Sequence, residues 1–492
     1  MNAYKTLLLL TFFTLICSDI TYSSAYTYTT EDCFAKGNVS SSQADKNVIL
    51  VKDGGNFSML KINVNKAGDT SDLDNANLYG LNAAFLVLNS STSTIYDSTI
   101  NTNGKGAYGL FAYGDNSKII IAQSTLKTKG SNSGLLATNS GIINPYHLEI
   151  FTSGDSSPFF TTTNNGTIIC EFCSGLTEGK DSPLIYSKGT VLLEYLEASA
   201  LNSQMIVIDG PNTVKFRDSD LYSFSKGSSD AETAGIFIYQ STERNDNEGS
   251  ARFLASGTGF NIFQNSTNYT TAPLFYVTNT KVDIILLGFN RFNYGSGVFL
   301  KVESNDKYGT SGKNGGEVSL YAFKETIEGD IICGANSKIS IYLTDNCELK
   351  GKISIIGNGI VNIYVGGDKW ELTGDSTVTN YQVYQFSKIE KGDYTLTGTE
   401  VTNLSKIITD FPEHSMFFMD SISSTKVTCT NKVPSENNGD DGGDNGDDGD
   451  GDGDNGDGDG DGDGDGDIKD DSSKAKFIYI NLLSFLFLIL IL

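Results

Sequence analysis

The chain has 492 residues and a formal net charge of −25, from 60 acidic and 35 basic side chains. This charge disfavours binding to nucleic acid, and it disfavours binding of the folded surface to anionic lipid headgroups. Only two histidines occur, His147 and His414, and they are far apart in the sequence. Catalysis by a histidine general base is therefore not expected.

The first 25 residues have the pattern of a secretory signal peptide. Lys5 precedes an apolar run from Leu7 to Ile16, and the small residues Ser23, Ser24 and Ala25 follow. This order is typical of a cleaved signal, with Ala25 as the last residue removed. We therefore expect the mature chain to enter the secretory pathway and to begin at Tyr26.

The C-terminus has the pattern of a lipid-anchor signal. An acidic stalk and spacer cover 434–476, and an apolar tail of 16 residues covers 477–492. Small residues, a polar spacer and a terminal apolar tail predict a glycosylphosphatidylinositol (GPI) anchor. The alternative is a single-pass transmembrane helix, although the tail is short for a span of about 20 residues. Both predictions place the chain at the extracellular face of the cell membrane. The candidate anchor sites are Gly464, Gly466, Ser472 and Ser473.

The stalk is almost pure Asp and Gly. From Gly439 to Asp467 it contains 14 Asp, 13 Gly and 2 Asn. It lacks the apolar position of calcium-binding β-roll repeats and the closing Glu of an EF-hand loop. We therefore expect a disordered, self-repelling spacer with a reach of about 30 Å. No cofactor or specific metal site is predicted.

Six cysteines remain once the signal peptide, which contains Cys17, is removed. They are Cys33, Cys170, Cys173, Cys333, Cys347 and Cys429. An even number in a secreted chain predicts disulfides, with fifteen arrangements open. We expect Cys333 to pair with Cys347 across neighbouring strands. Cys170 and Cys173 have the spacing of a redox or zinc motif, but no second such pair or nearby histidine accompanies them. A structural bridge, or separate partners for the two cysteines, is the preferred interpretation.

Short apolar strands recur along the middle of the chain behind pairs of small residues. Their first large residues are spaced by 25, 25, 24, 25 and 21 positions, at Phe85, Leu110, Leu135, Phe159, Leu184 and Met205. Two further strands follow each of the early ones, and turns are expected at Gly104, Gly130, Gly154 and Gly179. Glycine supplies the positive φ that such corners need.

This recurrence predicts an all-β fold, a right-handed parallel β-helix with three strands and about 21–25 residues per coil. A β-sandwich explains the short strands but not the regular recurrence. We assign 26–77 to an N-terminal cap, 78–380 to the β-helix and 381–433 to a C-terminal cap.

Three segments carry a resemblance to a known group of proteins: Ser131–Ile142, Asp181–Val191 and the block Gly329–Ser376. They resemble the repeats of surface-displayed, right-handed β-helix proteins of the adhesin-like and pertactin-like passenger type. The resemblance covers roughly 78–380 and implies the fold and a role in surface adhesion. The chain departs from that group at its end, where an acidic stalk and a lipid signal replace an outer-membrane domain.

Three functional classes follow from this organisation. The preferred one is non-catalytic adhesion or recognition of carbohydrate or protein; a structural coat protein is another. The third is a polysaccharide lyase or glycoside hydrolase, which needs carboxylates about 5–9 Å apart on one face. The candidate acids are Glu171, Glu194 and Glu197 in successive coils and Asp155 and Asp181 at corners, although surface acids at turns are common. Tyr108, Tyr269 and Tyr308 are candidates for stacking against sugars.

Seven Asn-x-Ser/Thr sequons are candidates for glycosylation in the secretory pathway. They are Asn38, Asn56, Asn89, Asn165, Asn265, Asn268 and Asn403.

Overall fold

The computed structural model describes residues 20–132, 134–224, 234–244, 248–263, 272–404 and 429. The chain forms two compact units, 1–437 and 438–492. The second unit lies wholly outside the described residues. It contains most of the predicted stalk, the anchor candidates Gly464, Gly466, Ser472 and Ser473, and the apolar tail.

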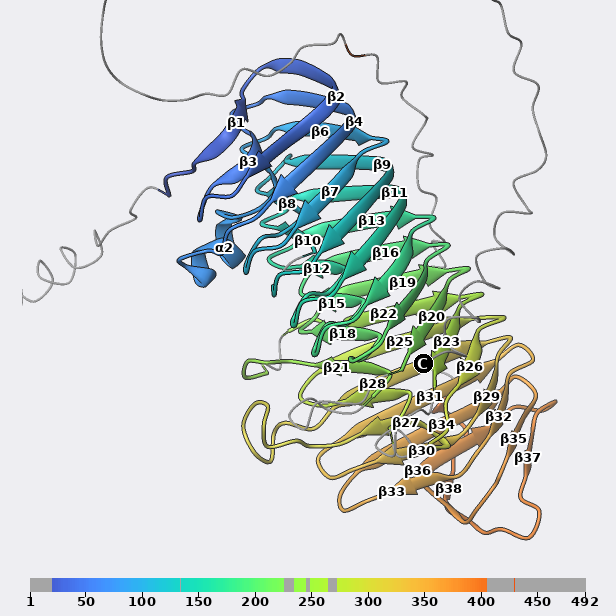
Figure 1. Cartoon of the computed structure of the whole chain (residues 1–492). Coiled ribbons are helices and arrows are strands. Elements are labelled where there is room, and N and C mark those ends of the chain that lie inside the picture. The colour runs from blue at the N-terminus through green and yellow to red at the C-terminus, as the bar shows by residue number, and fades with distance from the viewer. Residues whose placement is uncertain are drawn as a thin grey trace, which may run out of the picture. The chain divides into compact units, whose positions relative to one another are not determined.

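The first unit is a parallel β-helix, which confirms the predicted all-β solenoid with three strands per coil (Figure 1). One wall, sheet A, contains β1 (Ser24–Tyr28), β3 (Asn47–Val51), β5 (Phe85–Leu88), β8 (Leu110–Tyr113), β10 (Leu135–Thr138), β12 (Phe160–Thr162), β15 (Ile185–Ser187), β18 (Ile206–Asp209), β21 (Ile236–Tyr239), β24 (Phe275–Val277), β27 (Val298–Val302), β30 (Asp330–Cys333) and β33 (Ile353–Ile355).

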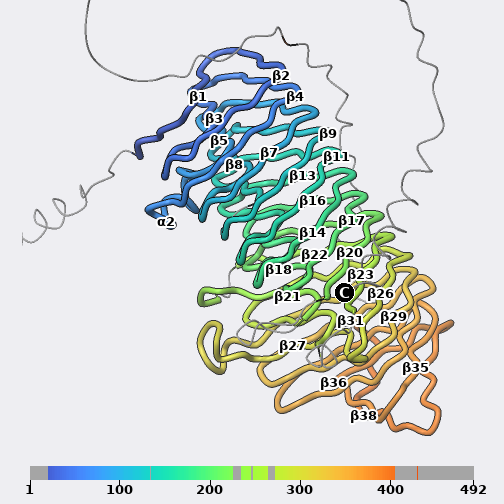
Figure 2. The backbone as a smooth tube through the Cα atoms, viewed as in Figure 1, coloured from blue at the N-terminus to red at the C-terminus, as the bar shows by residue number. Residues whose placement is uncertain are grey.

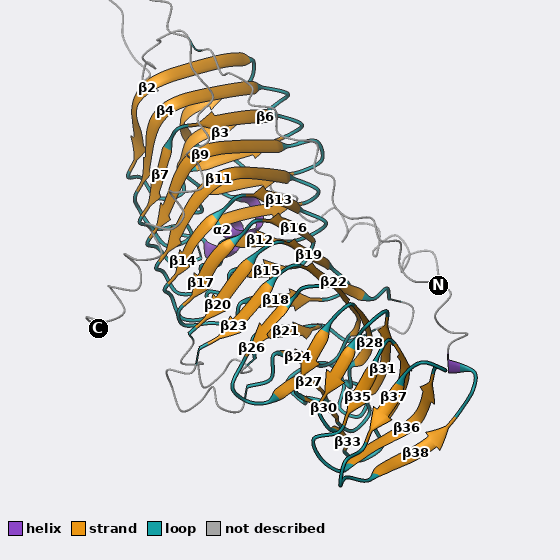
Figure 3. Ribbon diagram, turned by 90° about the vertical axis from the view of Figure 1, so that its right-hand side faces the viewer, coloured by secondary structure: helices purple, strands orange, loops and turns teal. Residues whose placement is uncertain are grey.

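Sheet B forms the long bent wall, which Figure 3 shows as stacked strands. It contains β2 (Glu31–Ser41), β4 (Asn56–Lys66), β6 (Thr92–Tyr96), β7 (Thr99–Thr102), β9 (Lys118–Thr128), β11 (Ile142–Thr152), β13 (Thr167–Glu171), β14 (Ser174–Thr177), β16 (Thr190–Glu194), β17 (Glu197–Ala200), β19 (Thr213–Arg217), β20 (Asp220–Ser223), β22 (Ala251–Ser256), β23 (Gly259–Ile262), β25 (Lys281–Leu287), β26 (Arg291–Asn293), β28 (Glu317–Phe323), β31 (Lys338–Thr344), β34 (Ile360–Gly366), β36 (Ser376–Val383) and β38 (Leu396–Glu400).

In the last coils a third wall, sheet C, separates from sheet B. It contains β29 (Thr326–Glu328), β32 (Glu348–Lys350), β35 (Lys369–Glu371) and β37 (Lys388–Glu390). One short helix, α2 (Leu73–Tyr79), lies outside the coils; Asp72 caps its N-terminus and Gly80 its C-terminus.

Residues at the same height in successive coils form columns, because every strand pairs in parallel with its equivalent in the next coil. In sheet A the first inward column contains Phe85, Leu110, Leu135, Phe160, Ile185 and Ile206. All six are buried in one continuous core. The predicted column agrees for the first three coils and is one residue early at Phe159, Leu184 and Met205. Those three side chains are also buried, in the place that Gly109 and Gly134 occupy in earlier coils.

Four predicted turn glycines lie one above another at a corner. A Cβ atom on Gly104, Gly130, Gly154 or Gly179 would come within 1.9–2.1 Å of the carbonyl oxygen of the glycine in the preceding coil. Their φ angles are not in the left-handed region. Glycine is therefore required here by the close approach of two backbones, and not by the positive φ that the sequence suggests.

The coils extend beyond the limits predicted from the sequence (Figure 2). β1 and β2 already pair in register with β3 and β4, so much of the segment 26–77, which the sequence predicts as an N-terminal cap, consists of strands that continue the same sheets. At the other end β36 pairs with β38, which carries the solenoid to Glu400. The first twenty residues of the predicted C-terminal cap, 381–433, therefore include strands of the solenoid, and most of the remainder of that cap lies outside the described part of the chain.

The contribution of the core columns to the stability of the fold can be tested at Phe253. Its ring is buried and contacts Phe216, Phe260 and Phe275. We expect Phe253→Ala to lower the free energy of unfolding by about 3–5 kcal/mol, because it removes buried area and leaves a cavity. Phe386, which is 83% exposed, is the matched control. Phe386→Ala should change stability by less than about 0.5 kcal/mol. Urea denaturation followed by circular dichroism measures both, and equal losses would contradict the packing described here.

Candidate functional site

Sheet B bends sharply in each coil, and the residue at the bend has a left-handed backbone. Eight such residues follow one another in register, with φ between 47° and 58°. This corner column consists of Lys36, Lys61, Asp97, Gln123, His147, Phe172, Tyr195 and Asp218. The left-handed region is uncommon for any residue other than glycine and most unusual for bulky side chains. The three successive rings in the middle of the column are therefore its unusual feature.

The three rings stack on one another along the axis of the solenoid. The centroids of His147 and Phe172 are 4.8 Å apart with 11° between the ring planes. Phe172 and Tyr195 are 4.6 Å apart with 6° between the planes, and Tyr146 meets Phe172 edge-on. Stacking contributes about 0.5–1.5 kcal/mol per pair, which offsets part of the cost of the left-handed backbone. Phe172 and Tyr195 nevertheless remain 40% and 43% exposed.

A disulfide holds the middle ring in place. Cys170 and Cys173 are bonded to each other and enclose Glu171 and Phe172 in the loop between them. Both cysteines are buried in the core. The Cys-x-x-Cys motif is thus a structural bridge, which was one of the two interpretations preferred from the sequence. It ties the exposed corner to the packed interior.

A row of charged residues lies on one side of the aromatic stack. Glu171, Glu194 and Arg217 are register partners in β13, β16 and β19. Glu194 is buried and forms an ion pair with Arg217. Burial, and secondarily the neighbouring Glu194, raises the pKa of Glu171, while Arg217 acts in the opposite direction. Glu194 is therefore committed to Arg217, and Glu171 is the carboxyl of this row that remains available to a ligand.

A second charged row lies on the other side of the bend. Glu197 pairs in register with Asp220, and Arg291 lies further along. The guanidinium of Arg291 is 2.7 Å from a carboxylate oxygen of Asp220. Burial, and then the charge of Asp220, raises the pKa of Glu197. The structure thus brings Glu171 and Glu194 together in one row and places Glu197 across the corner from them.

The other predicted acids lie elsewhere. Asp155 is at a turn next to Gly154, where its carboxylate accepts the backbone N–H of Lys180 at 2.8 Å. Asp181 has a left-handed backbone one coil further on. A carboxylate that accepts a backbone N–H in this way supports a turn. These two acids are therefore best explained as parts of the corner structure.

The predicted sugar-stacking tyrosines are not grouped at one site. Tyr108 is buried, and its hydroxyl donates to Asn77 of α2 at 3.0 Å, so it cannot stack against a ligand. Tyr308 packs on Phe237 and Tyr239 outside sheet A. Tyr269 lies outside the described residues.

Five of the seven sequons fall on described residues, and all five asparagines are exposed: Asn38, Asn56, Asn89, Asn165 and Asn403. Asn265 and Asn268 lie outside the described part of the chain. Asn89 and Asn165 lie at the turns that follow β5 and β12, away from the aromatic stack.

Ala25, the predicted signal-cleavage residue, lies within β1, so cleavage after it would shorten that strand to Tyr26–Tyr28.

The predicted bridge between Cys333 and Cys347 is wrong. Both are free, buried thiols. Cys333 ends a strand of sheet A and its Sγ lies 3.4 Å from the carbonyl oxygen of Ser337, whereas Cys347 precedes a strand of sheet C and accepts the N–H of Glu325. Burial raises the pKa of each thiol to about 11, which makes both unreactive at neutral pH. The second bridge joins Cys33 to Cys429.

Among the residues that the structure describes, no group of three or more His, Cys, Asp or Glu side chains could hold a metal ion. The described part of the chain also contains no helix that is long and apolar enough to cross a membrane.

Comparisons with known proteins identify no relative of this chain. The sequence matches no protein-family model, and no curated protein matches it significantly. The nearly all-parallel stacked sheets agree with the resemblance to β-helix proteins at the level of a parallel solenoid.

The aromatic stack was missed in the sequence, although a signal for it exists. His147, Phe172 and Tyr195 are spaced by 25 and 23 residues, which matches the recurrence of the coils. The second signal is the Cys-x-x-Cys motif, which places Phe172 inside a short disulfide loop.

Glu325 is a buried acid beside Lys324, a later member of the corner column. Asn290 donates its side-chain amide to Glu325 at 2.6 Å. Burial raises the pKa of Glu325 to about 7, and the hydrogen bonds from Asn290 and Gly288 partly counter this rise. The folded state therefore binds a proton more tightly than the unfolded state, whose carboxyl has an ordinary pKa.

This difference predicts a pH dependence of stability. The contribution of Glu325 is fully present below its unfolded pKa and is lost as the pH rises through about 7. The free energy of unfolding should fall by at most about 3 kcal/mol across this range. Glu325→Gln should remove that part of the dependence. Urea denaturation of both proteins at pH 4.5 to 8 measures it, and parallel curves for the two would contradict the assignment.

Proposed function

We propose that this protein is a non-catalytic recognition or adhesion protein, secreted and attached to the outer face of the cell membrane by a GPI anchor. Its ligand is a glycan, bound at the corner formed by the aromatic stack and its two charged rows. The resemblance to adhesin-like β-helix proteins supports the same class of function.

The observation that carries this proposal is the exposure of Phe172 and Tyr195 on a strained backbone. A ring that only served folding would be buried, and strained positions are frequent at binding sites. Tyr195 is the last ring of the stack, and the next register position is occupied by Asp218. The apolar face of a sugar ring fits against such an aromatic end. The neighbouring Glu171, Glu197 and Arg291 provide hydrogen-bond acceptors and donors for its hydroxyl groups.

The charged rows favour binding over hydrolysis. A glycosidase needs two carboxyl groups that both reach the scissile bond. In the row nearest the stack, Glu194 is buried and committed to Arg217, so one row does not supply both groups. The coils repeat the outer face many times, which suits multivalent contact with an extended ligand.

Disulfide chemistry supports an extracellular location. The folded unit contains two bridges, and such bridges persist in oxidising compartments. The N-terminal signal and the C-terminal apolar tail are the basis for secretion and anchoring.

The corner can be tested on a glycan array with the mature protein. We expect Tyr195→Ala to weaken glycan binding by at least about tenfold, because it removes the exposed end of the stack. Tyr384→Ala is the control, since Tyr384 is similarly exposed in the last coils. Binding that is unchanged by Tyr195→Ala would refute the corner as the site. Shortened glycan products would show instead that the protein is an enzyme.

The anchor can be tested on intact expressing cells. Treatment with phosphatidylinositol-specific phospholipase C should release the protein into the medium, without the tail Phe477–Leu492. Retention on the cells, with that tail detected by mass spectrometry, would show a transmembrane protein instead.

A further inference from the structure

A further aromatic residue lies at the same corner as the stack, several coils later. Phe289 has a left-handed backbone, with φ at 62°, and its side chain is 79% exposed. A bulky residue is most unusual in this backbone region, and an exposed ring contributes little to folding. Phe289 therefore has the same two features that distinguish Phe172 and Tyr195 within the corner column.

The register of the strands places Phe289 in the corner column itself. Beyond Tyr195 the next members of the column are Asp218, Gly257 and Phe289. The strands that begin two residues after these corner positions are β17, β20, β23 and β26, and Figure 3 shows them stacked in succession. Three register steps separate Tyr195 from Phe289, which is about 14 Å along the solenoid axis.

Polar groups occupy the corner between the two rings, because two glycines leave room for them. A Cβ atom on Gly257 would collide with a carboxylate oxygen of Asp218, so this carboxylate lies over Gly257. A Cβ atom on Gly259 would collide in the same way with Asp220. The guanidinium of Arg291 holds Asp220 at 2.7 Å and also donates to the carbonyl oxygen of Gly257 at 3.4 Å. Hydrogen-bond donors and acceptors thus lie between an aromatic residue at each end.

Acidic side chains are in excess along this part of the corner. Both arginines are engaged, Arg217 with Glu194 and Arg291 with Asp220. Three further acids lie in the same rows and in the corner column: Glu171, Glu197 and Asp218. An excess of carboxylates repels anionic ligands. The corner therefore suits an uncharged glycan better than a polyuronate or a sulfated glycan.

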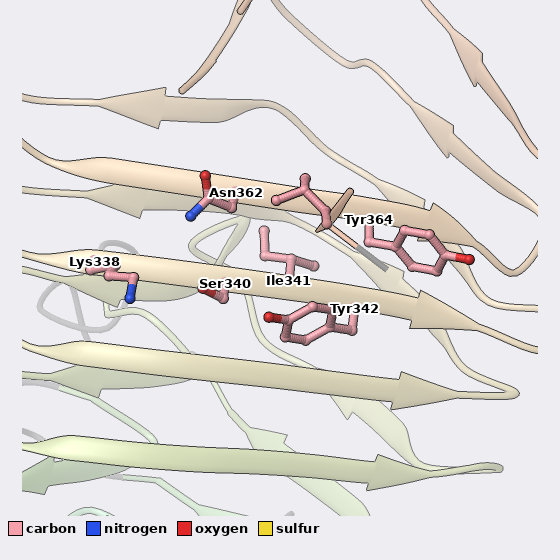
Figure 4. Close-up of a pocket in the computed structure, with 7 residues that line it drawn as sticks. Lys338, Ser340, Ile341, Tyr342, Asn362 and Tyr364 are labelled. Atoms are coloured by element: carbon pink, nitrogen blue, oxygen red, sulfur yellow. The ribbon is translucent and has the colours of Figure 1, made fainter. Parts of the chain in front are cut away.

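The outer face of sheet B carries another row of aromatic residues, Tyr321, Tyr342 and Tyr364, which are register partners in successive coils. Tyr342 and Tyr364 are only 6% and 9% exposed. Figure 4 shows both beside a hollow of about 80 Å³. This volume is well below the roughly 300 Å³ of a small-molecule pocket. The row therefore offers no open ring face to a sugar, and the corner remains the aromatic surface that does.

We propose that the corner from Tyr195 to Phe289 is one continuous binding site for a linear, uncharged glycan that runs parallel to the solenoid axis with one sugar ring per coil. The spacing of about 4.8 Å between coils is close to the length of one pyranose unit in an extended chain. The sugars at the two ends stack on Tyr195 and Phe289. The two sugars between them form hydrogen bonds with Asp218, Asp220 and Arg291.

The proposal makes four sugars the shortest glycan that contacts both rings at once. It rests on the proposed glycan-binding function and adds to it the length, direction and charge class of the ligand. It also assigns a binding role to Phe289, which lies three coils from the aromatic stack.

Titration calorimetry on the mature protein can test this site with defined probes. The probes are linear oligomers of glucose, mannose, xylose and N-acetylglucosamine, each of two to six sugars, and polygalacturonate. We expect at least one neutral series to gain about tenfold or more in affinity between three and four sugars, because only the longer chain reaches both rings. Polygalacturonate should not bind.

The decisive variant is Phe289→Asn, which removes the ring and keeps a residue type that tolerates the left-handed backbone. It should abolish the gain between three and four sugars, whereas Phe289→Tyr should retain it. Phe386→Ala is the control, since Phe386 is 83% exposed in the last coils and far along the chain from the corner. It should leave the length dependence intact.

The results also separate this inference from the proposed function. If Tyr195→Ala weakens binding but the gain at four sugars survives Phe289→Asn, the extended site is wrong and glycan binding at the stack stands. Affinity that is already maximal at two sugars, or tighter binding of polygalacturonate than of every neutral oligomer, would likewise overturn the inference. If no neutral oligomer binds, the inference and the proposed glycan ligand both fail.

Discussion

Every feature of the folded unit depends on the parallel pairing of each coil with the next. Because the ladders keep the same register from β2 to β34, equal heights in successive coils become columns. Inward columns contain the apolar core, and the close backbone contact at one corner demands glycine, as at Gly130. Outward columns can contain many different residue types, because they do not pack in the core. The same geometry that stacks Ile and Phe inside also stacks His147, Phe172 and Tyr195 outside.

A solenoid whose coils contact only their neighbours is weakest at its ends. Here the first coil has an additional link, because the bridge between Cys33 and Cys429 spans 396 residues of sequence. It couples the first coil to the chain that leaves the last one, which nearest-neighbour pairing alone cannot do. A closed loop of this length restricts the unfolded state strongly in the chain-entropy account.

The sequence predicts the solenoid well because each coil repeats the same short pattern of apolar strands and small residues. Apolar strands near every 25 residues are sufficient to identify the coils from Phe85 onward. The exact register is harder, since Phe159 and Phe160 are both apolar and both buried. The first coils do not show this spacing, because the paired residues Ile49 and Phe85 are 36 positions apart in the sequence and α2 lies between them.

The site was less predictable because it depends on contacts between coils. In the sequence alone, Glu194 has the features of a surface acid. Only the pairing of β16 with β19 shows that Arg217 lies beside it and forms an ion pair with it. Cysteine pairing is a property of the three-dimensional path, so Cys33 finds a partner 396 residues away while Cys333 and Cys347 occupy different walls. A corner residue with a positive φ is easy to predict from the sequence when it is Asn or Gly, but not when it is Phe or Tyr, as at Phe172 and Tyr195.

The most direct test of this account is disulfide mapping of the native protein by proteolysis without reduction, followed by mass spectrometry. The account predicts one cross-linked peptide that joins Cys33 to Cys429 and a second that contains the Cys170–Cys173 bridge. Cys333 and Cys347 should be alkylated only after unfolding. A bridge between Cys333 and Cys347, or a different partner for Cys33, would contradict this arrangement of the chain.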